Sequence, residues 1–361
     1  MQLTDVWFVL IAVLWIGYFV LEGFDFGVGM LLGVLGSARP RSELASPAGR
    51  SRRIPDEPNR RVLINTIGPV WDGNEVWLLV AGGATFAAFP EWYASLFSGF
   101  YLALLVILVA LILRGVAFEY RGKVDSPQWR RRWDLVIIIG SIVPALLWGV
   151  AFGNIVRGVK LNADHLYIGS FFDLLNPYAL LGGLVTLTLF ATHGAIFVAL
   201  KTDGPIRAEA RALATKAGAA CVVLAVTFLL WTQLGYGSGW TWVTTGLAAA
   251  ALVGGLYANL RGREGWAFLA TAVTIVAAVV TLFGSLYPNV LPSTVDPSFS
   301  LTVDNASSTP YTLKVMSWAA VIVTPVVLGY QGWTYWVFRK RITVEQIPAP
   351  IGLPLGRGAD G

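Results

Sequence analysis

The chain has 361 residues, of which 56% are hydrophobic and only 13% are charged. Soluble globular domains carry about a quarter charged residues, so this composition excludes an ordinary soluble enzyme or binding domain. The formal net charge of +5 is interpreted as a sign of membrane orientation, and no nucleic-acid partner is predicted.

Apolar segments recur along the whole chain. Most are long enough, at about 1.5 Å per residue, to cross a hydrocarbon core about 30 Å thick. We therefore predict an all-α polytopic membrane protein with one membrane domain, 1–361. The nine predicted transmembrane helices span residues 6–36, 61–89, 91–120, 133–155, 176–201, 209–234, 240–260, 264–286 and 311–339. The final stretch, 347–361, is rich in Pro and Gly and is predicted to be a disordered tail.

Basic residues are distributed unequally between the two sides of the predicted membrane. The connections and tail on one side carry 22 Lys and Arg residues, and the other side carries only Arg157, Lys160 and Lys314. The positive-inside rule makes the rich side cytoplasmic, which places the N-terminus outside and the C-terminus inside. The basic segment 37–59 is predicted to be a flexible cytoplasmic loop. It either contacts anionic lipid, at about 1 kcal/mol per basic residue, or acts as an unstructured tether.

Four acidic residues fall inside the first two predicted helices. Glu22 and Asp25 lie in the first helix, and Asp72 and Glu75 lie in the second. Each pair is spaced three residues apart, so the two carboxyl groups of a pair share one helix face. Asp25 and Asp72 each lie about 11 residues from the cytoplasmic end of their helix, which is roughly 16 Å deep. If the two helices are antiparallel neighbours, all four acids meet at one depth.

Acidic side chains at this depth are energetically costly, so their presence needs a physical explanation. Each charged carboxylate costs about 2.5–3.5 kcal/mol at the centre of a membrane helix. Intramembrane acids mark proton or ion pathways by default, and proton transfer is the interpretation we favour. The alternative is structural: Asp72 and Glu75 hydrogen-bond Asn65, Asn74 and the backbone, and brace a helix that packs closely through Gly73.

Arg114, in the third predicted helix, lies at a depth comparable to Asp72. An arginine there needs a carboxylate or a route for its head group to water. We expect it to pair with Asp72 or Glu75, which leaves the other acid as the titrating group. Glu119 and Asp134 lie nearer the water on the same side, where they either form the mouth of a proton path or are solvated and cap helices.

Other polar groups give weaker signals. His193 lies in the middle of its helix, where it either ligates a haem iron or hydrogen-bonds a neighbouring helix, and we favour the hydrogen bond. The single Cys221 excludes a disulfide framework within this chain. The predicted helices from 176 to 286 contain no mid-membrane acid. This asymmetry argues against a proton-coupled transporter, because both halves of an inverted repeat are expected to carry polar groups.

Several stretches resemble subunit II of cytochrome bd-type quinol oxidases. The most specific is WDGNEVW (71–77), within the longer matching block 65–104. The others are LEGFDFGVGML (21–31), LRGVAFEYR (113–121), WGVAFGN (148–154), FFDLLNPYALLGGL (171–184) and TLKVMSWAAVIVTPVVLGYQGWTYWVF (312–338). Together they span the chain from end to end, and the basic segment 37–59 is a departure from the family pattern.

The resemblance implies two four-helix bundles and one peripheral helix, in the bacterial cytoplasmic membrane, paired with a subunit I. The family oxidises quinol and reduces dioxygen to water with protons from the cytoplasm. Haems b558, b595 and d are expected in the partner subunit I, and no metal or cofactor is assigned to this chain. A structural quinone in this chain and a small single-helix partner subunit stay open.

The resemblance also implies roles for individual residues. Asp72, the acid of the WDGN motif, is expected on a proton path toward the haem site, with Glu22 and Asp25 beside it. Glu75 fills a position where some relatives carry glutamine. The supporting residues are Arg114, Asn74 and Glu119. A subunit that serves only structure and assembly is the alternative function.

Overall fold

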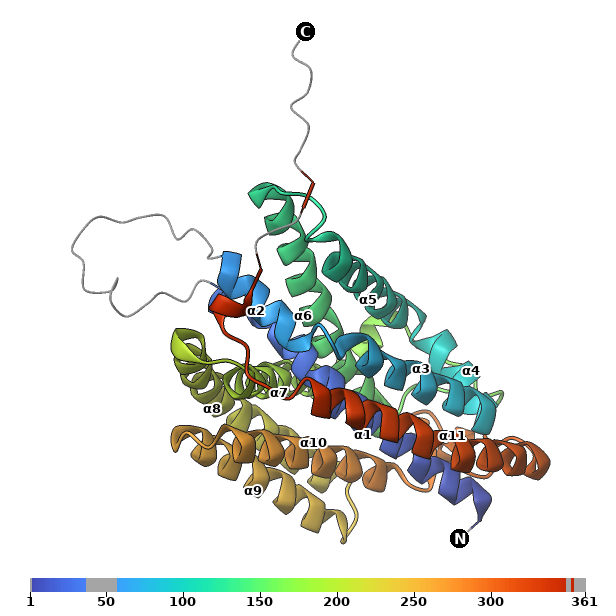
Figure 1. Ribbon diagram of the computed structural model, residues 1–361. Coiled ribbons are helices and arrows are strands. Elements are labelled where there is room, and N and C mark those ends of the chain that lie inside the picture. Colours follow the sequence, from blue (N-terminus) through green and yellow to red (C-terminus); the bar gives the residue numbers. More distant parts are fainter. Residues whose placement is uncertain (1, 37–56, 349–351, 354–361) are drawn as a thin grey trace.

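The computed structural model describes residues 2–36, 57–348 and 352–353 (Figure 1). Within this part, eight helices are long and apolar enough to span a membrane. They are α1 (Leu3–Leu35), α5 (Tyr101–Tyr120), α6 (Pro127–Arg157), α7 (Pro177–Lys201), α8 (Gly204–Gly235), α9 (Thr241–Leu260), α10 (Glu264–Leu286) and α11 (Pro310–Val337). The chain is thus a helical polytopic membrane protein, as predicted. The predicted count of nine spans is not confirmed by these eight.

The predicted helices 61–89 and 91–120 are both interrupted. The second still supplies the span α5, whereas neither part of the first is among the eight. The first consists of α2 (Glu57–Ile67) and α3 (Trp71–Ala88), and the second consists of α4 (Pro90–Gly99) and α5. A turn at 68–70 separates α2 from α3, because Pro69 has no N–H to donate and disfavours helical geometry at Gly68. The kink at Phe100 is milder, since its N–H still donates to Leu96 O at 2.9 Å.

Two further boundaries differ from the prediction. Helix α2 begins at Glu57, so the last three residues of the predicted loop 37–59 are helical, while 37–56 lie outside the described residues. In the predicted tail 347–361, Leu353 pairs with Val124 as an isolated parallel bridge, with Leu353 N donating to Lys123 O at 2.9 Å. That residue is therefore tied to the loop after α5, and most of the tail lies outside the described residues.

Helix starts are marked by a repeated local signal. Ser126, Asn176 and Thr309 each precede a proline, and each side chain accepts a hydrogen bond from the backbone N–H three residues later. Proline fits the first helical position because its missing N–H would have no partner there. Capping by Ser, Thr or Asn satisfies one of the free backbone donors at the helix start. These pairs fix where α6, α7 and α11 begin.

Helix α1 lies at the centre of the molecule and contacts α3, α6, α7 and α10. Helices α7, α8, α9 and α10 form a ring of neighbours, and α5 packs on α6. Helix α11 lies on the outside, along α1 and α3 (Figure 1), and Leu313 is the only buried residue within it. The short elements are η1 (Phe171–Leu174), η2 (Pro297–Phe299), η3 (Val344–Gln346) and the antiparallel pair β1 (Asn289–Leu291) and β2 (Leu301–Thr302).

Glycine allows α1 and α7 to approach closely. A Cβ at Gly27 would lie 2.1 Å from Phe190 O and 2.6 Å from the Cα of Gly194. No side chain fits at these distances, so the two backbones touch directly, as small residues permit in membrane helices. This contact holds the helix that carries Glu22 and Asp25 against the second half of the chain.

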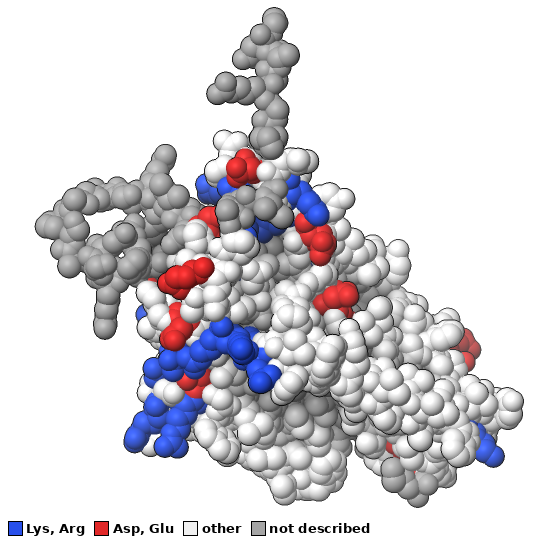
Figure 2. Space-filling model, viewed as in Figure 1, with Lys and Arg blue, Asp and Glu red and all other residues white. Residues whose placement is uncertain are grey.

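Charged side chains gather at one end of the molecule. Figure 2 shows Lys and Arg near the ends of α8 and α10 and the segment after α11, whereas the face over α3, α4 and α11 carries few charges. We call the charged end the basic end, defined by Arg60, Arg121, Arg207 and Arg341. Its arginines are paired: Arg207 Nη2 lies 2.9 Å from Glu264 Oε1.

Candidate functional site

Arg114 is the centre of a cluster of buried charges formed by α1, α3 and α5. Its side chain is fully buried, and it donates from Nη1 to Glu22 Oε1 and, at 2.9 Å, to Glu75 Oε1. The guanidinium also lies over the rings of Phe26 and Phe118, with centroid distances of 4.8 and 5.2 Å. Desolvated cation–π contacts of this kind add to the ion pairs. One arginine therefore joins an acid of α1 to an acid of α3.

The predicted partner of Arg114 was Asp72 or Glu75, and the structure confirms Glu75 and adds Glu22. Asp72 is not a partner: it is exposed on the first turn of α3 and makes no hydrogen bond or ion pair with the described residues. Glu75 is intermediate, with a side-chain exposure of 23%, whereas Glu22 and Asp25 are fully buried. The acids thus range from exposed to fully buried.

Asn74 connects α3 to the other acid of α1. Its Nδ2 donates to Asp25 Oδ2 at 2.7 Å, and its Oδ1 accepts from Tyr335 OH at 2.8 Å. Asn74 does not bond Asp72 or Glu75, so the bracing arrangement considered from the sequence is wrong in its partners. Tyr335 and Gln331 of α11, which were not predicted, belong to this cluster. A signal for Gln331 existed, because a glutamine is unusual in an apolar helix.

Several polar atoms of the cluster are buried without a hydrogen-bond partner among the described protein atoms. They are Glu22 Oε2, Asp25 Oδ1, Arg114 Nε and Arg114 Nη2. Most buried polar atoms in proteins are hydrogen-bonded, and exceptions point to a functional group, a bound proton or an ordered solvent molecule. Glu22 and Asp25 lie three residues apart on α1, so their carboxyl groups share one face of that helix.

A second charge cluster lies at the basic end and involves Asp134. This acid is buried and accepts from Arg60 and, at 2.5 Å, from Arg121 Nε. Arg121 also pairs with both oxygens of Glu57, at 2.8 and 2.9 Å. Burial disfavours the charge of Arg121, but the hydrogen bonds to Glu57 and Asp134 raise its pKa above the ordinary value. The cluster ties α2 to the end of α5 and the start of α6. Asp134 is therefore engaged in ion pairs and is not open to solvent as the mouth of a proton path would be. Glu119 is exposed.

His193 makes a hydrogen bond through each ring nitrogen. Nδ1 lies 2.7 Å from Thr271 Oγ1, and Nε2 lies 3.2 Å from Val20 O. The ring also stacks on Phe268 at 4.5 Å between centroids. The predicted hydrogen bond to a neighbouring helix is therefore confirmed.

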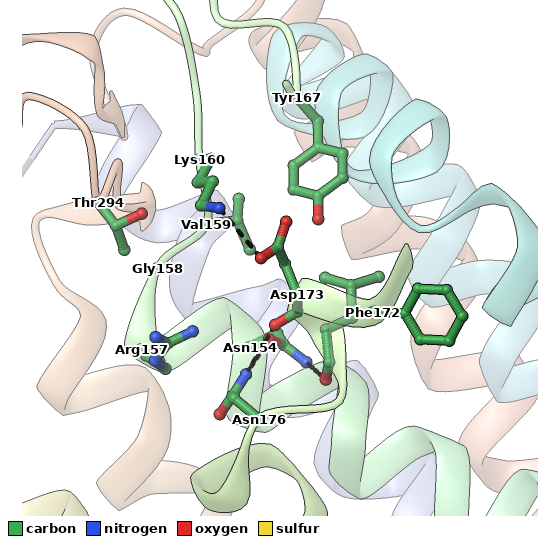
Figure 3. Close-up of a pocket in the computed structure, with 11 residues that line it drawn as sticks. Asn154, Arg157, Gly158, Val159, Lys160, Tyr167, Phe172, Asp173, Asn176 and Thr294 are labelled. Atoms are coloured by element: carbon green, nitrogen blue, oxygen red, sulfur yellow. Dashed lines mark hydrogen bonds and ion pairs between the residues drawn. The ribbon is translucent and has the colours of Figure 1, made fainter. Parts of the chain in front are cut away.

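A polar pocket opens at the opposite end, around the loop after α6 (Figure 3). Its volume is about 230 Å³, and it includes an ion pair of 3.0 Å between Lys160 and Asp173. The backbone N–H of Ser170 and then Lys160 lower the pKa of Asp173 below its ordinary value. In Figure 3, Arg157 projects away from the Asp173 carboxylate. The pocket shares no residue with the Arg114 cluster, and its bonds serve to hold the loop on the end of α6.

The fold and the cluster define a helical polytopic membrane protein with buried acids bound to an arginine. The sequence model of the family described as "Cytochrome bd terminal oxidase subunit II" matches residues 3–338. The chain is 42% identical to "Cytochrome bd ubiquinol oxidase subunit 2" of Bacillus subtilis, over 96% of this chain and 98% of that protein. It is 37% identical to "Cytochrome bd-I ubiquinol oxidase subunit 2" of Escherichia coli, over 96% of both chains. The chain belongs to the family of cytochrome bd terminal oxidase subunit II.

A solved structure supports the fold independently. A chain of the bd oxidase from Geobacillus thermodenitrificans matches with a TM-score of 0.74, covering 94% of this chain and 99% of that chain. Its sequence identity is 17%, so this likeness concerns the fold alone. As a subunit 2, this chain is part of an oxidoreductase complex with a partner subunit, and the family name implies haems in that complex.

Both nitrogens of His193 are engaged, and no group of three or more His, Cys, Asp or Glu is placed to hold a metal ion within the described ranges. The apolar cavity between α1, α6, α7, α8 and α10 has a volume of about 60 Å³. A cavity that accepts a benzene ring has about 150 Å³, so a quinone ring is too large for it.

Proposed function

We propose that this chain is the proton-delivering subunit of a quinol oxidase in the bacterial cytoplasmic membrane. In this proposal the complex oxidises quinol and reduces dioxygen to water, and subunit I binds haems b558, b595 and d. The basic end faces the cytoplasm, which places the N-terminus outside. The names of the relatives, which are ubiquinol oxidase subunits, support the quinol substrate class.

The observation that carries the proposal is the graded burial of the acids around Arg114. Asp72 is exposed, and Glu75 is partly exposed and shares Arg114 with the fully buried Glu22. The fully buried Asp25 lies three residues after Glu22 on the same face of α1. Carboxyl groups are efficient proton carriers when successive groups lie within hydrogen-bond reach or one ordered water apart. The series therefore offers a route between the surface of α3 and the interior of the bundle.

The surroundings of Asp72 indicate where the partner subunit docks. Large apolar side chains of α3 and of its neighbour α11 are exposed, including Leu79 at 73%, Val326 at 70% and Tyr330 at 68%. Leu79 lies seven residues, about two turns, after Asp72 and so on the same face of α3. An acid that faced lipid there would cost about 2.5–3.5 kcal/mol, which a polar partner surface avoids. We propose that subunit I covers this face, so that Asp72 passes protons across the subunit interface. Glu119, exposed near the end of α5, is proposed as a residue of the entry side.

The test is oxygen consumption by the intact complex carrying Asp72→Asn. Asparagine keeps the size and hydrogen bonding of the side chain but removes the exchangeable proton. We expect turnover per haem to fall by at least about 100-fold, the lower range for loss of a proton-transfer group. Glu345→Gln, in the exposed η3, is a matched control that leaves turnover unchanged. Normal turnover of the Asp72→Asn complex with full haem content would refute the proposal.

A second function, structural support alone, is favoured by one observation. The Glu22–Arg114–Glu75 ion pairs join α1, α3 and α5, and breaking a buried pair is strongly destabilising. If bracing is the whole role, Glu75→Gln lowers assembly or haem content and leaves turnover per haem intact. The ratio of turnover to haem therefore separates the two functions.

A further inference from the structure

A chain of hydrogen bonds connects α11 to the buried acid Asp25. Trp77 Nε1 donates to Gln331 Oε1 at 2.9 Å, and Gln331 Nε2 donates to Asn74 Oδ1 at 3.3 Å. Asn74 Nδ2 then donates to Asp25 Oδ2 at 2.7 Å. The four side chains come from α3, α11, α3 and α1, in that order. Gln331 is thus the link through which the outermost helix reaches the acid.

The direction of this chain is fixed by its first member. An indole N–H can only donate, so the atom of Gln331 that faces Trp77 must be the amide oxygen. The amide nitrogen of Gln331 therefore faces Asn74, and the atom of Asn74 that it meets must also be an oxygen. This leaves the nitrogen of Asn74 facing Asp25. Reversing either amide would place two donors against each other.

Tyr335 supports this orientation but does not impose it. Its hydroxyl lies 2.8 Å from Asn74 Oδ1, and a hydroxyl both donates and accepts. If Asn74 turned over, Tyr335 would accept from the amide nitrogen instead. The reversed orientation of Asn74 is excluded only by Trp77, because its indole N–H can only donate and so fixes the amide of Gln331.

The fixed direction of the hydrogen-bond chain determines which oxygen of Asp25 can carry its proton. Oδ2 faces a fixed donor, so it is an acceptor in both protonation states of the acid. The exchangeable proton has only Oδ1 left, and this atom is buried without a partner among the described protein atoms. Glu22, whose Oε2 is also without one, lies three residues before Asp25 on the same face of α1.

We infer that Trp77 and Gln331 are positioning residues that confine the exchangeable proton of Asp25 to Oδ1, the oxygen that does not face Asn74. The inference deepens the proposed function and rests on it. Through this arrangement a proton enters and leaves Asp25 by one oxygen, and the side facing Asn74 and α11 is closed to it. Helix α11 therefore has a role in proton transfer although it carries no acid of the cluster.

The test is an infrared difference spectrum of the intact complex, recorded between two pH values, with the Asp25 carboxyl band identified by its loss in Asp25→Asn. In the unaltered complex the carbonyl Cγ=Oδ2 accepts from Asn74, which lowers its stretching frequency. Gln331→Glu, when ionised, accepts from both Trp77 and Asn74 and so reverses Asn74. The proton then moves to Oδ2, and we expect the band to shift to higher frequency. Turnover should fall roughly five-fold, which corresponds to one hydrogen bond.

Two further variants and a control make the result specific. Gln331→Leu and Trp77→Phe remove the constraint without reversing it, so the band should split or broaden. Thr334→Val, on the same helix, removes a hydroxyl that bonds only Tyr330 O, and it should leave the band unchanged. An unshifted band in Gln331→Glu with normal haem content would overturn the inference, as would the absence of any band lost in Asp25→Asn. The proposed function would still be judged separately, by turnover of Asp72→Asn.

Discussion

Replacing Arg114 by methionine should strongly destabilise the protein through the loss of its two carboxylate partners. Methionine keeps an unbranched apolar stem that still packs on Phe26 and Phe118, so the change isolates the charge. Arg114 and Glu22 are both fully buried. Removing one partner of a buried ion pair costs about 3–5 kcal/mol, because the remaining charge is left uncompensated.

A double-mutant cycle with Glu22→Gln measures the coupling. The single change Glu22→Gln weakens a hydrogen bond to a charged group, which is worth about 1.5–3 kcal/mol. The double variant Arg114→Met with Glu22→Gln leaves only the partly exposed Glu75 unpaired, so it should be no less stable than Arg114→Met alone. We therefore expect a coupling energy of at least about 1.5 kcal/mol, within the range for residues in direct contact.

The assay is unfolding of the intact complex in mixed detergent micelles, followed by tryptophan fluorescence. The pair Arg130 and Asp125, joined at 2.9 Å with Asp125 55% exposed, serves as the matched control. Its coupling should be about 0–1 kcal/mol, as for exposed ion pairs. A coupling between Arg114 and Glu22 as small as that of the control would refute the reasoning.

Four other outcomes follow from the contacts. Gly27→Ala forces α1 away from α7, and blue native electrophoresis should show loss of assembled complex. Asp134→Asn leaves two arginines without a buried carboxylate, so backbone amides of α2 should exchange hydrogen faster by mass spectrometry. His193→Leu removes two hydrogen bonds at about 1 kcal/mol each. The melting temperature of the complex should therefore fall, whereas its haem absorbance should stay unchanged. Because the folded pKa of Asp173 is lowered, its stabilisation is complete above the ordinary pKa of about 3.9 and is lost as pH falls through the folded pKa. Asp173→Asn should therefore flatten the acid limb of the stability profile measured by thermal unfolding.

Hydropathy was sufficient to predict most helices, because a long apolar run has few alternatives to a membrane helix. The breaks were harder, although Gly68 and Pro69 gave a usable signal for the turn between α2 and α3. The kink at Phe100 carries no proline, and its helical hydrogen bonds continue on both sides. Ser98 and Gly99 directly precede it, and such a pair is a known cause of helix bending that the sequence analysis did not use.

The acids themselves could be predicted from the sequence, but their partners could not. Spacing of three residues places Asp72 and Glu75 on neighbouring parts of one helix, yet it does not say which of them faces inward. The rotation of α3 leaves Asp72 exposed and directs Glu75 toward Arg114. Glu22 reaches the same arginine from α1, a pairing of residues 92 positions apart in the chain. Such a contact depends on tertiary packing, which no local pattern encodes.

Gln331 shows the same limit for polar residues outside the acid motifs. The resemblance directs attention to the WDGN block, whereas the contact from α11 to Asn74 joins residues 257 positions apart. A lone glutamine in an apolar helix indicates that some polar partner exists. It does not indicate that the partner orients a buried acid.

The most direct test of the central claim is proton uptake during a single turnover. The fully reduced intact complex, in lipid vesicles with a pH indicator on the side of the basic end, is mixed with oxygen. For Asp72→Asn with full haem content, the account predicts that proton uptake and the protonation-dependent step of oxygen reduction slow together, by at least about 100-fold. Uptake at the rate of the unaltered complex would contradict the claim that protons pass through this chain.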